Sequence, residues 1–140
     1  MAFEWLNDTG GSDIWVLDLD SGAVEQRTTS PTADDFPSCS PDGNVAVFTR
    51  KNDVENRKEL YVASLSGTQQ VSALTWDGAP IVGVYPDWSP TGNAIAFYYD
   101  ADAWQVPVDP VTGQPTGPPE QLTSDYVAVR ECSPTWSPLL

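Results

Sequence analysis

The sequence predicts an all-β protein built from three similar units. Short runs of β-branched and aromatic residues alternate with turns rich in glycine and proline, of which the chain has 10 and 13. No segment carries the sustained 3.6-residue apolar period of an amphipathic helix. A motif of the form Pro-x-x-Ser-Pro-x-Gly-Asn recurs at intervals of about 48 residues. These three observations together favour repeated small sheets over a helical or mixed fold.

The repeated motif occupies residues 36–44 and 85–93, with a truncated third copy at 133–138. Proline fixes φ and glycine supplies a positive φ in a tight hairpin turn, while the tryptophan ring is expected to fill the wedge between neighbouring units. A threonine keeps the same interval, at Thr28, Thr75 and Thr123. The motif residues are Ser40, Pro41, Asp42 and Gly43, then Trp88, Ser89, Pro90 and Gly92, then Trp136, Ser137 and Pro138.

The unit that follows the second motif contains four short candidate strands. They lie at 94–99, at 104–108, near 121–123 and at 127–129. Four strands in about 48 residues is the period of one propeller blade. We therefore predict a β-propeller unit over residues 1–140 with three four-stranded blades of about 48 residues. The repeats are placed at about 1–44, 45–93 and 94–140.

The residues of the repeat resemble the TolB-type WD-like propeller family. The resemblance rests on Trp-Ser-Pro, then Asp/Thr-Gly-Asn, a strand ending in Ala-Phe, and a strand of Ile/Leu-aromatic-Val type. It covers nearly the whole chain in three consecutive copies, although Cys39 stands where the other copies have tryptophan. The resemblance implies a non-catalytic scaffold in the periplasm or outside the cell.

The two ends of the chain match complementary parts of one blade. The third motif stops at Leu139 and Leu140, where the next strand is due, and Ala2, Phe3 and Trp5 fit that missing strand. Three blades are too few for a closed ring, since propellers typically have four to eight. Three explanations stay open: a head-to-tail dimer with six blades, a piece of a longer propeller, and an open head-to-tail filament. Completion of the last blade by the N-terminal strand of the same chain or of a neighbour is part of this expectation.

Charge and composition exclude several classes of function. Six basic residues stand against 20 acidic ones, giving a formal net charge of -14, so nucleic acid and anionic lipid are poor partners. No apolar stretch is long enough to span a membrane, and no secretory signal is visible. The absence of histidine and of a Gly-x-Ser-x-Gly turn removes the usual nucleophilic triads and makes zinc binding hard to build. We therefore expect no catalytic residues.

Cofactor candidates are few. Cys39 and Cys132 lack metal-ligand spacing, and either a disulfide or two free thiols is compatible with the sequence. Calcium is the one metal to consider, because two segments place carboxylates at alternate positions, and neither continues into EF-hand spacing. Aspartate at turns commonly bonds nearby backbone, so we expect no cofactor. The weak calcium candidates are Asp18, Asp20, Asp100 and Asp102.

Three kinds of function follow from these observations. The first is a non-catalytic structural or protein-interaction module that binds itself or other proteins, and assembles through its complementary ends. The second is the propeller portion of a larger enzyme of the prolyl-oligopeptidase-like type, which needs a catalytic domain elsewhere. The third is a carbohydrate-binding module that uses exposed aromatic residues such as Trp76 and Tyr126.

Overall fold

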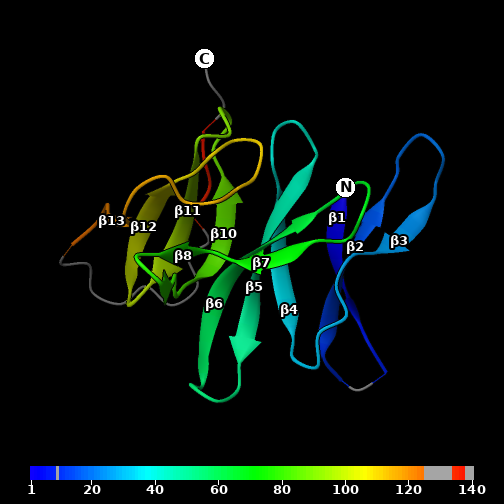
Figure 1. The fold of residues 1–140 in the computed structure, drawn as a ribbon, viewed down its shortest axis with the longest axis horizontal. Helices are drawn as coiled ribbons and strands as arrows, with labels where there is room; N and C mark the ends of the chain where they lie inside the picture. The colour runs from blue at the N-terminus through cyan, green and yellow to red at the C-terminus, as the bar shows by residue number, and fades with distance from the viewer. Residues whose placement is uncertain (9, 125–133, 138–140) are drawn as a thin grey trace.

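The computed structural model describes residues 1–8, 10–124 and 134–137, and it contains strands and no helix in these ranges (Figure 1). Within them there is therefore no helix able to cross a membrane. The strands are β1 (Ala2–Leu6), β2 (Ser12–Leu17), β3 (Val24–Gln26), β4 (Asp34–Cys39), β5 (Val45–Asn52), β6 (Arg57–Ser64), β7 (Val71–Ala73), β8 (Thr75–Trp76), β9 (Ala79–Pro80), β10 (Val84–Trp88), β11 (Ala94–Tyr99), β12 (Asp102–Pro107) and β13 (Glu120–Gln121).

The strands form three antiparallel sheets and one small hairpin. The first sheet is β1-β2-β3, the second is β4-β5-β6-β7 and the third is β10-β11-β12-β13, while β8 and β9 pair with each other. The second sheet lies between the other two (Figure 1). The all-β prediction is confirmed, but three four-stranded blades are not, because the first sheet has three strands among the described residues.

Cross-strand register establishes which residues of the three sheets are equivalent. In each sheet one phenylalanine faces one aromatic residue on the next strand. These pairs are Phe3–Trp15, Phe48–Tyr61 and Phe97–Trp104. β1, β5 and β11 are therefore equivalent strands, as are β2, β6 and β12, and β4 and β10 are the inner strands that precede β5 and β11.

The sheets begin one strand earlier than the predicted repeats. The motif residues themselves form β4 and β10, because the Ser-Pro-x-Gly-Asn turn closes a hairpin with the strand that follows. Each motif strand therefore belongs to the sheet after it, and the boundaries at 44 and 93 fall inside hairpins. The strand predicted at 127–129 lies outside the described residues.

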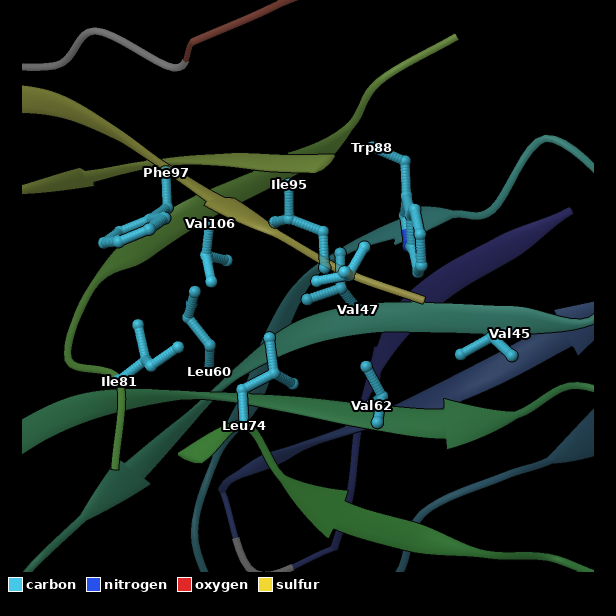
Figure 2. Close-up of a cluster of buried hydrophobic side chains, with 11 residues drawn as sticks. Val45, Val47, Leu60, Val62, Leu74, Ile81, Trp88, Ile95, Phe97 and Val106 are labelled. Carbon is cyan, nitrogen blue, oxygen red and sulfur yellow. The ribbon is translucent and has the colours of Figure 1, made fainter. Parts of the chain in front are cut away.

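Two apolar clusters hold the sheets together. The larger one joins the facing sides of the second and third sheets, and Figure 2 shows Val47 and Leu60 directed toward Phe97 and its neighbours. Trp88 is only 5% exposed in this cluster, between the second and third sheets. The smaller cluster joins the first and second sheets through Ile14 and Phe48.

Candidate interaction surface

The Ser-Pro-x-Gly-Asn turn has a structural role in both of its complete copies. The Ser40 hydroxyl accepts a 3.1 Å hydrogen bond from the Val45 amide and donates a 2.6 Å bond to the Asp42 carboxylate. The Ser89 hydroxyl accepts the equivalent 3.1 Å bond from Ala94. Donation from Ser40 and from Asn44 lowers the pKa of Asp42, because both favour the charged carboxylate.

The prolines and glycines complete these turns as predicted from the motif. Gly43 and Gly92 have φ of 73° and 74°, a region where glycine carries no steric penalty. Pro41 and Pro90 precede them in the two loops. Ser137 follows Trp136 at the end of the described residues, and Pro138, Leu139 and Leu140 lie beyond them.

The inner strands are joined by hydrogen bonds that repeat from sheet to sheet. The Ser38 hydroxyl donates a 2.9 Å bond to Asp87 and accepts a 3.2 Å bond from the Trp88 amide. Asp87 in turn accepts a 3.3 Å bond from the Trp136 amide, and its carbonyl accepts a 3.1 Å bond from the Trp136 indole. The third motif therefore continues the series of inner strands beyond β10.

Each inner strand contains a bulge that places an aromatic residue in the left-handed region. Phe36 has φ of 56° and Tyr85 has φ of 53°, each where the register with the next strand shifts. Their rings lie 4.4 Å apart, and the Lys58 ammonium lies 5.0 Å from the Phe36 ring. Such a conformation costs about 1–3 kcal/mol per residue, so the bulges mark positions where the side-chain direction matters more than local backbone energy.

The bulges border a cavity of about 390 Å³ on the inner strands, which we call the inner-strand pocket. Its walls are aromatic rings, prolines, hydroxyl groups and one carboxylate, a composition suited to binding an extended chain. Sequence reasoning missed it, because aromatic residues rarely adopt a positive φ and nothing local announces one. The lining residues are Phe36, Pro37, Ser38, Tyr85, Pro86, Asp87, Pro134 and Thr135.

β1 is an exposed edge strand. Among the described residues, no strand pairs with the side of β1 that faces away from β2. Trp5 is 55% exposed. Phe3 is half-buried, while the equivalent residues Phe48 and Phe97 are 0% and 1% exposed. Of the residues predicted to act in assembly, Ala2 and Phe3 are half-buried.

Among the calcium candidates, Asp18 binds backbone amides and Asp102 binds side chains. One Asp18 oxygen accepts 2.9 Å bonds from the amides of Asp20 and Ser21, and the bond from Ser21 is the main reason that the pKa of Asp18 is lowered. Asp102 accepts a 2.8 Å bond from the Thr123 hydroxyl, and Asp100 lies in a turn with φ of 50°. The described residues contain no cluster of three or more His, Cys, Asp or Glu placed to hold a metal ion.

A second cavity, of about 320 Å³, lies between the β8–β9 hairpin and the third sheet, and we call it the aromatic pocket. Trp76, Tyr99 and Trp104 line it, and the Tyr99 and Trp104 rings meet edge to face at 6.1 Å. Trp104 is half-buried, and it packs against the larger apolar cluster from this wall. Tyr126, the other aromatic candidate for a glycan, lies outside the described residues.

Cys39 is half-buried, and its thiol has no disulfide partner among the described residues. It occupies the β4 position that Trp88 holds in β10. Cys132 lies outside the described residues, so a disulfide between Cys39 and Cys132 and a pair of free thiols both remain compatible with the sequence.

Comparisons with known proteins agree with this geometry. No family model matches the chain. Two curated bacterial proteins are each 30% identical to part of it: an uncharacterized protein of Agrobacterium fabrum, over 69% of this chain and 32% of its own length, and the Tol-Pal system protein TolB of Rhizorhabdus wittichii, over 58% and 17%. The chain thus spans a third or less of the curated relatives it matches.

Solved structures show the same fold. A structure assigned to TolB from Agrobacterium tumefaciens gives a TM-score of 0.67 at 21% identity, over 88% of this chain and 44% of that one. TolB from Acinetobacter baumannii gives 0.63 at 22% identity, over 91% and 30%. The β-propeller domain of the Trilobed protease from Pyrococcus furiosus gives 0.58 at 15% identity, over 89% and 39%. The chain therefore has the fold of a β-propeller, and its repeats are similar to those of TolB proteins.

Proposed function

We propose that this chain is a non-catalytic protein-interaction module that assembles through its two complementary ends. The observation that carries the proposal is the exposed edge of β1, which has no inner strand beside it in the described part of the chain, whereas β5 and β11 each have one. An unpaired edge with exposed apolar residues beside it is a template for another strand. The segment at 134–137 could supply such a strand, and its Trp136 is hydrogen-bonded to Asp87 of β10.

Two copies joined in this way would bring together six sheets, which falls within the usual range for a closed propeller. An open filament uses the same contact without closure. The TolB-type repeats support a periplasmic or extracellular location and protein partners besides a second copy. For these partners we propose the inner-strand pocket as the contact site.

The chemistry of that pocket supports binding and not catalysis. Its carboxylate belongs to Asp87, and both oxygens already accept hydrogen bonds, one from Ser38 and one from Trp136. A general base needs an oxygen directed at substrate, with a second group to complete the reaction.

The solution mass of the purified chain tests assembly. Light scattering behind a sizing column should find a species at twice 15.2 kDa for the closed dimer, or a broad distribution of larger species for the filament. A monomer over the whole accessible concentration range would refute assembly, and would leave the inner-strand pocket as the remaining basis for protein binding.

A carbohydrate-binding role is the second candidate, and the aromatic pocket favours it. Stacking on Trp76 and Tyr99 would suit the apolar face of a sugar ring. Trp76→Ala should abolish binding on a glycan array while Trp5→Ala keeps it, and the absence of binding to every glycan would refute this role. A place within a larger enzyme remains a further proposal, which the protease propeller supports at the level of fold alone.

A further inference from the structure

The first sheet has an aromatic face that no described residue covers. Side chains alternate along a strand, so Met1, Phe3 and Trp5 share one face of β1, and the register places Trp15 and Leu17 beside them on β2. The rings pack on one another, with Trp5 6.0 Å from Phe3 and 5.5 Å from Trp15. Met1 is nonetheless 59% exposed and Trp5 55% exposed. We call these five residues the leading face.

In the other two sheets the equivalent face is covered by the preceding sheet. Phe48, the equivalent of Phe3, is fully buried against Ile14 and Ala2 of the first sheet. Phe97, the third equivalent, is buried in the cluster that contains Val47 of the second sheet. The same kind of contact between sheets therefore occurs twice within the chain. The leading face has the surface for a third such contact, and no described residue covers it.

The third sheet carries the other half of this contact. Val45, Val47 and Val62 of the second sheet belong to the cluster that covers Phe97. By the register, their equivalents in the third sheet are Ala94, Ala96 and Gln105. Ala94 and Gln105 line a cavity of about 680 Å³ together with Pro107 and Trp136. We call these four cavity residues the trailing face.

Trp136 lies at this cavity as Trp88 lies in the cluster between the second and third sheets. Trp88 packs beside Val62 and is almost fully buried, whereas Trp136 is half-buried at the trailing face. Trp136 thus occupies the position from which it could pack between the third sheet and a further one, and that further sheet is not among the described residues.

Charge also favours a protein surface as the occupant of the leading face. The chain has 20 acidic side chains, yet the only acidic side chain that the register places beside the leading face, Asp13 opposite Trp5, is 3% exposed. At the trailing face the cavity is lined by one acidic residue, Glu120. A large aromatic face without an exposed charge on so acidic a molecule is typical of a surface that becomes buried in an assembly. The complementary half of the contact is on the same chain, which makes a second copy the matching partner.

We propose that the leading face of one copy packs against the trailing face of the next, with the motif at 134–137 as the inner strand beside β1. This inference rests on the proposed function and names its interface. By equivalence with the pairs Ser38–Val47 and Asp87–Ala96, Thr135 of one copy lies opposite Ala2 of the other. The inner-strand series then continues across the junction, where the Cys39 amide of one copy donates to the Thr135 hydroxyl of the other, as Trp88 does to Ser38.

The junction places Thr135 of one copy beside Ser38 of the other, as Ser38 lies beside Asp87 within one chain. Two proteins, one with Ser38→Cys and one with Thr135→Cys, are prepared with Cys39→Ser and Cys132→Ser, then mixed and oxidised. A covalent dimer at twice 15.2 kDa on a non-reducing gel is expected. A mixture of Ser72→Cys with Thr135→Cys is the mismatched control, because Ser72 lies on the outer strand β7. A single chain with Ser38→Cys and Asp87→Cys is the positive control.

A pair of surface variants gives a second test that leaves the series of inner-strand bonds intact. Trp5→Lys should abolish assembly in light scattering, while Val54→Lys, at a residue 91% exposed and outside both faces, should leave it unchanged. Assembly without the cross-link between 38 and 135, or assembly insensitive to Trp5→Lys, would overturn this interface and leave self-assembly standing. A monomeric wild-type chain would overturn both.

Discussion

The Ser38 hydroxyl donates a 2.9 Å hydrogen bond to the Asp87 carboxylate, and the two residues hold equivalent positions on neighbouring inner strands. The same hydroxyl accepts a hydrogen bond from the Trp88 amide, and the Asp87 carboxylate accepts one from the Trp136 amide. Each member of the series therefore joins its own sheet to the next. Because these hydrogen bonds repeat from sheet to sheet, we expect their loss to destabilise the molecule. The same repetition predicts where an added sheet would lie.

Removal of the Ser38 hydroxyl should destabilise the chain. Ser38→Ala leaves one oxygen of the Asp87 carboxylate without its donor and the Trp88 amide without its acceptor, and we expect a loss of about 1–3 kcal/mol in the free energy of unfolding. Urea denaturation measures it, with Ser66→Ala at an exposed position as the control. Equal stability of the two variants would show that the bond between Ser38 and Asp87 contributes nothing.

The turn glycines should differ in their tolerance of a methyl group. Gly22 and Gly113 have φ of 72° and 70°, so alanine strains the backbone at both. At Gly113 a Cβ would also meet Val62 at 3.0 Å and Trp88 at 3.3 Å, whereas at Gly22 nothing lies within 4 Å. Gly22→Ala should cost about 1 kcal/mol and Gly113→Ala distinctly more, by thermal or urea unfolding. Equal costs would mean that the 113 turn does not pack against the second sheet.

Asp42 should contribute to acid sensitivity. The bonds from Ser40 and Asn44 lower the pKa of Asp42 in the folded chain below its ordinary value of 3.8. A depressed folded-state pKa means that this stabilisation is present above the unfolded value, and is lost as the pH falls through the folded one. Asp42→Asn should therefore flatten the decline of stability below about pH 4. A decline identical to that of the wild type, in urea melts over this range, would contradict the assignment.

Salt should promote assembly. Each copy has a formal net charge of -14, so two copies repel at low ionic strength, while the proposed contact is apolar. Sodium chloride shortens the Debye length from about 30 Å at 0.01 M to about 10 Å at 0.1 M, which weakens the repulsion and leaves apolar contact intact. Light scattering across this range should show the mean mass rise. A fall in mass with added salt would indicate an ionic interface instead.

Local sequence chemistry predicted the turns and the repeated packing. The Ser-Pro-x-Gly-Asn motif places Ser40 and Ser89 where their hydroxyls close a hairpin, and its interval of about 48 residues indicated equivalent positions in successive units. It did not predict the β8–β9 hairpin at Thr75 and Trp76, although Asp77-Gly78 is a common hairpin turn.

The β8–β9 hairpin was not predicted because the hydrogen-bond partners at this position of the second sheet differ from those of the other two sheets. In the first sheet the Thr28 hydroxyl accepts a hydrogen bond from the Ile14 amide of β2, and in the third sheet the Thr123 hydroxyl accepts one from the Ala103 amide of β12. In the second sheet the Ile81 carbonyl accepts the equivalent Leu60 amide at 2.9 Å. Thr75 therefore matches in sequence and differs in role. Long-range choices of this kind, and the bulge at Phe36, depend on packing that the local sequence does not encode.

Amide hydrogen exchange in β1 tests the central claim most directly. Met1 and Leu17 form a hydrogen-bonded pair, in which each backbone amide donates to the other residue's carbonyl. Hydrogen-bonded and non-hydrogen-bonded pairs alternate along an antiparallel ladder, so the Phe3 amide points toward β2 and the amides of Ala2 and Glu4 point toward the free edge. Exchange read by NMR at low and high protein concentration should show Phe3 protected throughout, and Ala2 and Glu4 protected only once copies associate. Rapid exchange at Ala2 and Glu4 in a fully assembled sample would contradict strand completion by a second copy.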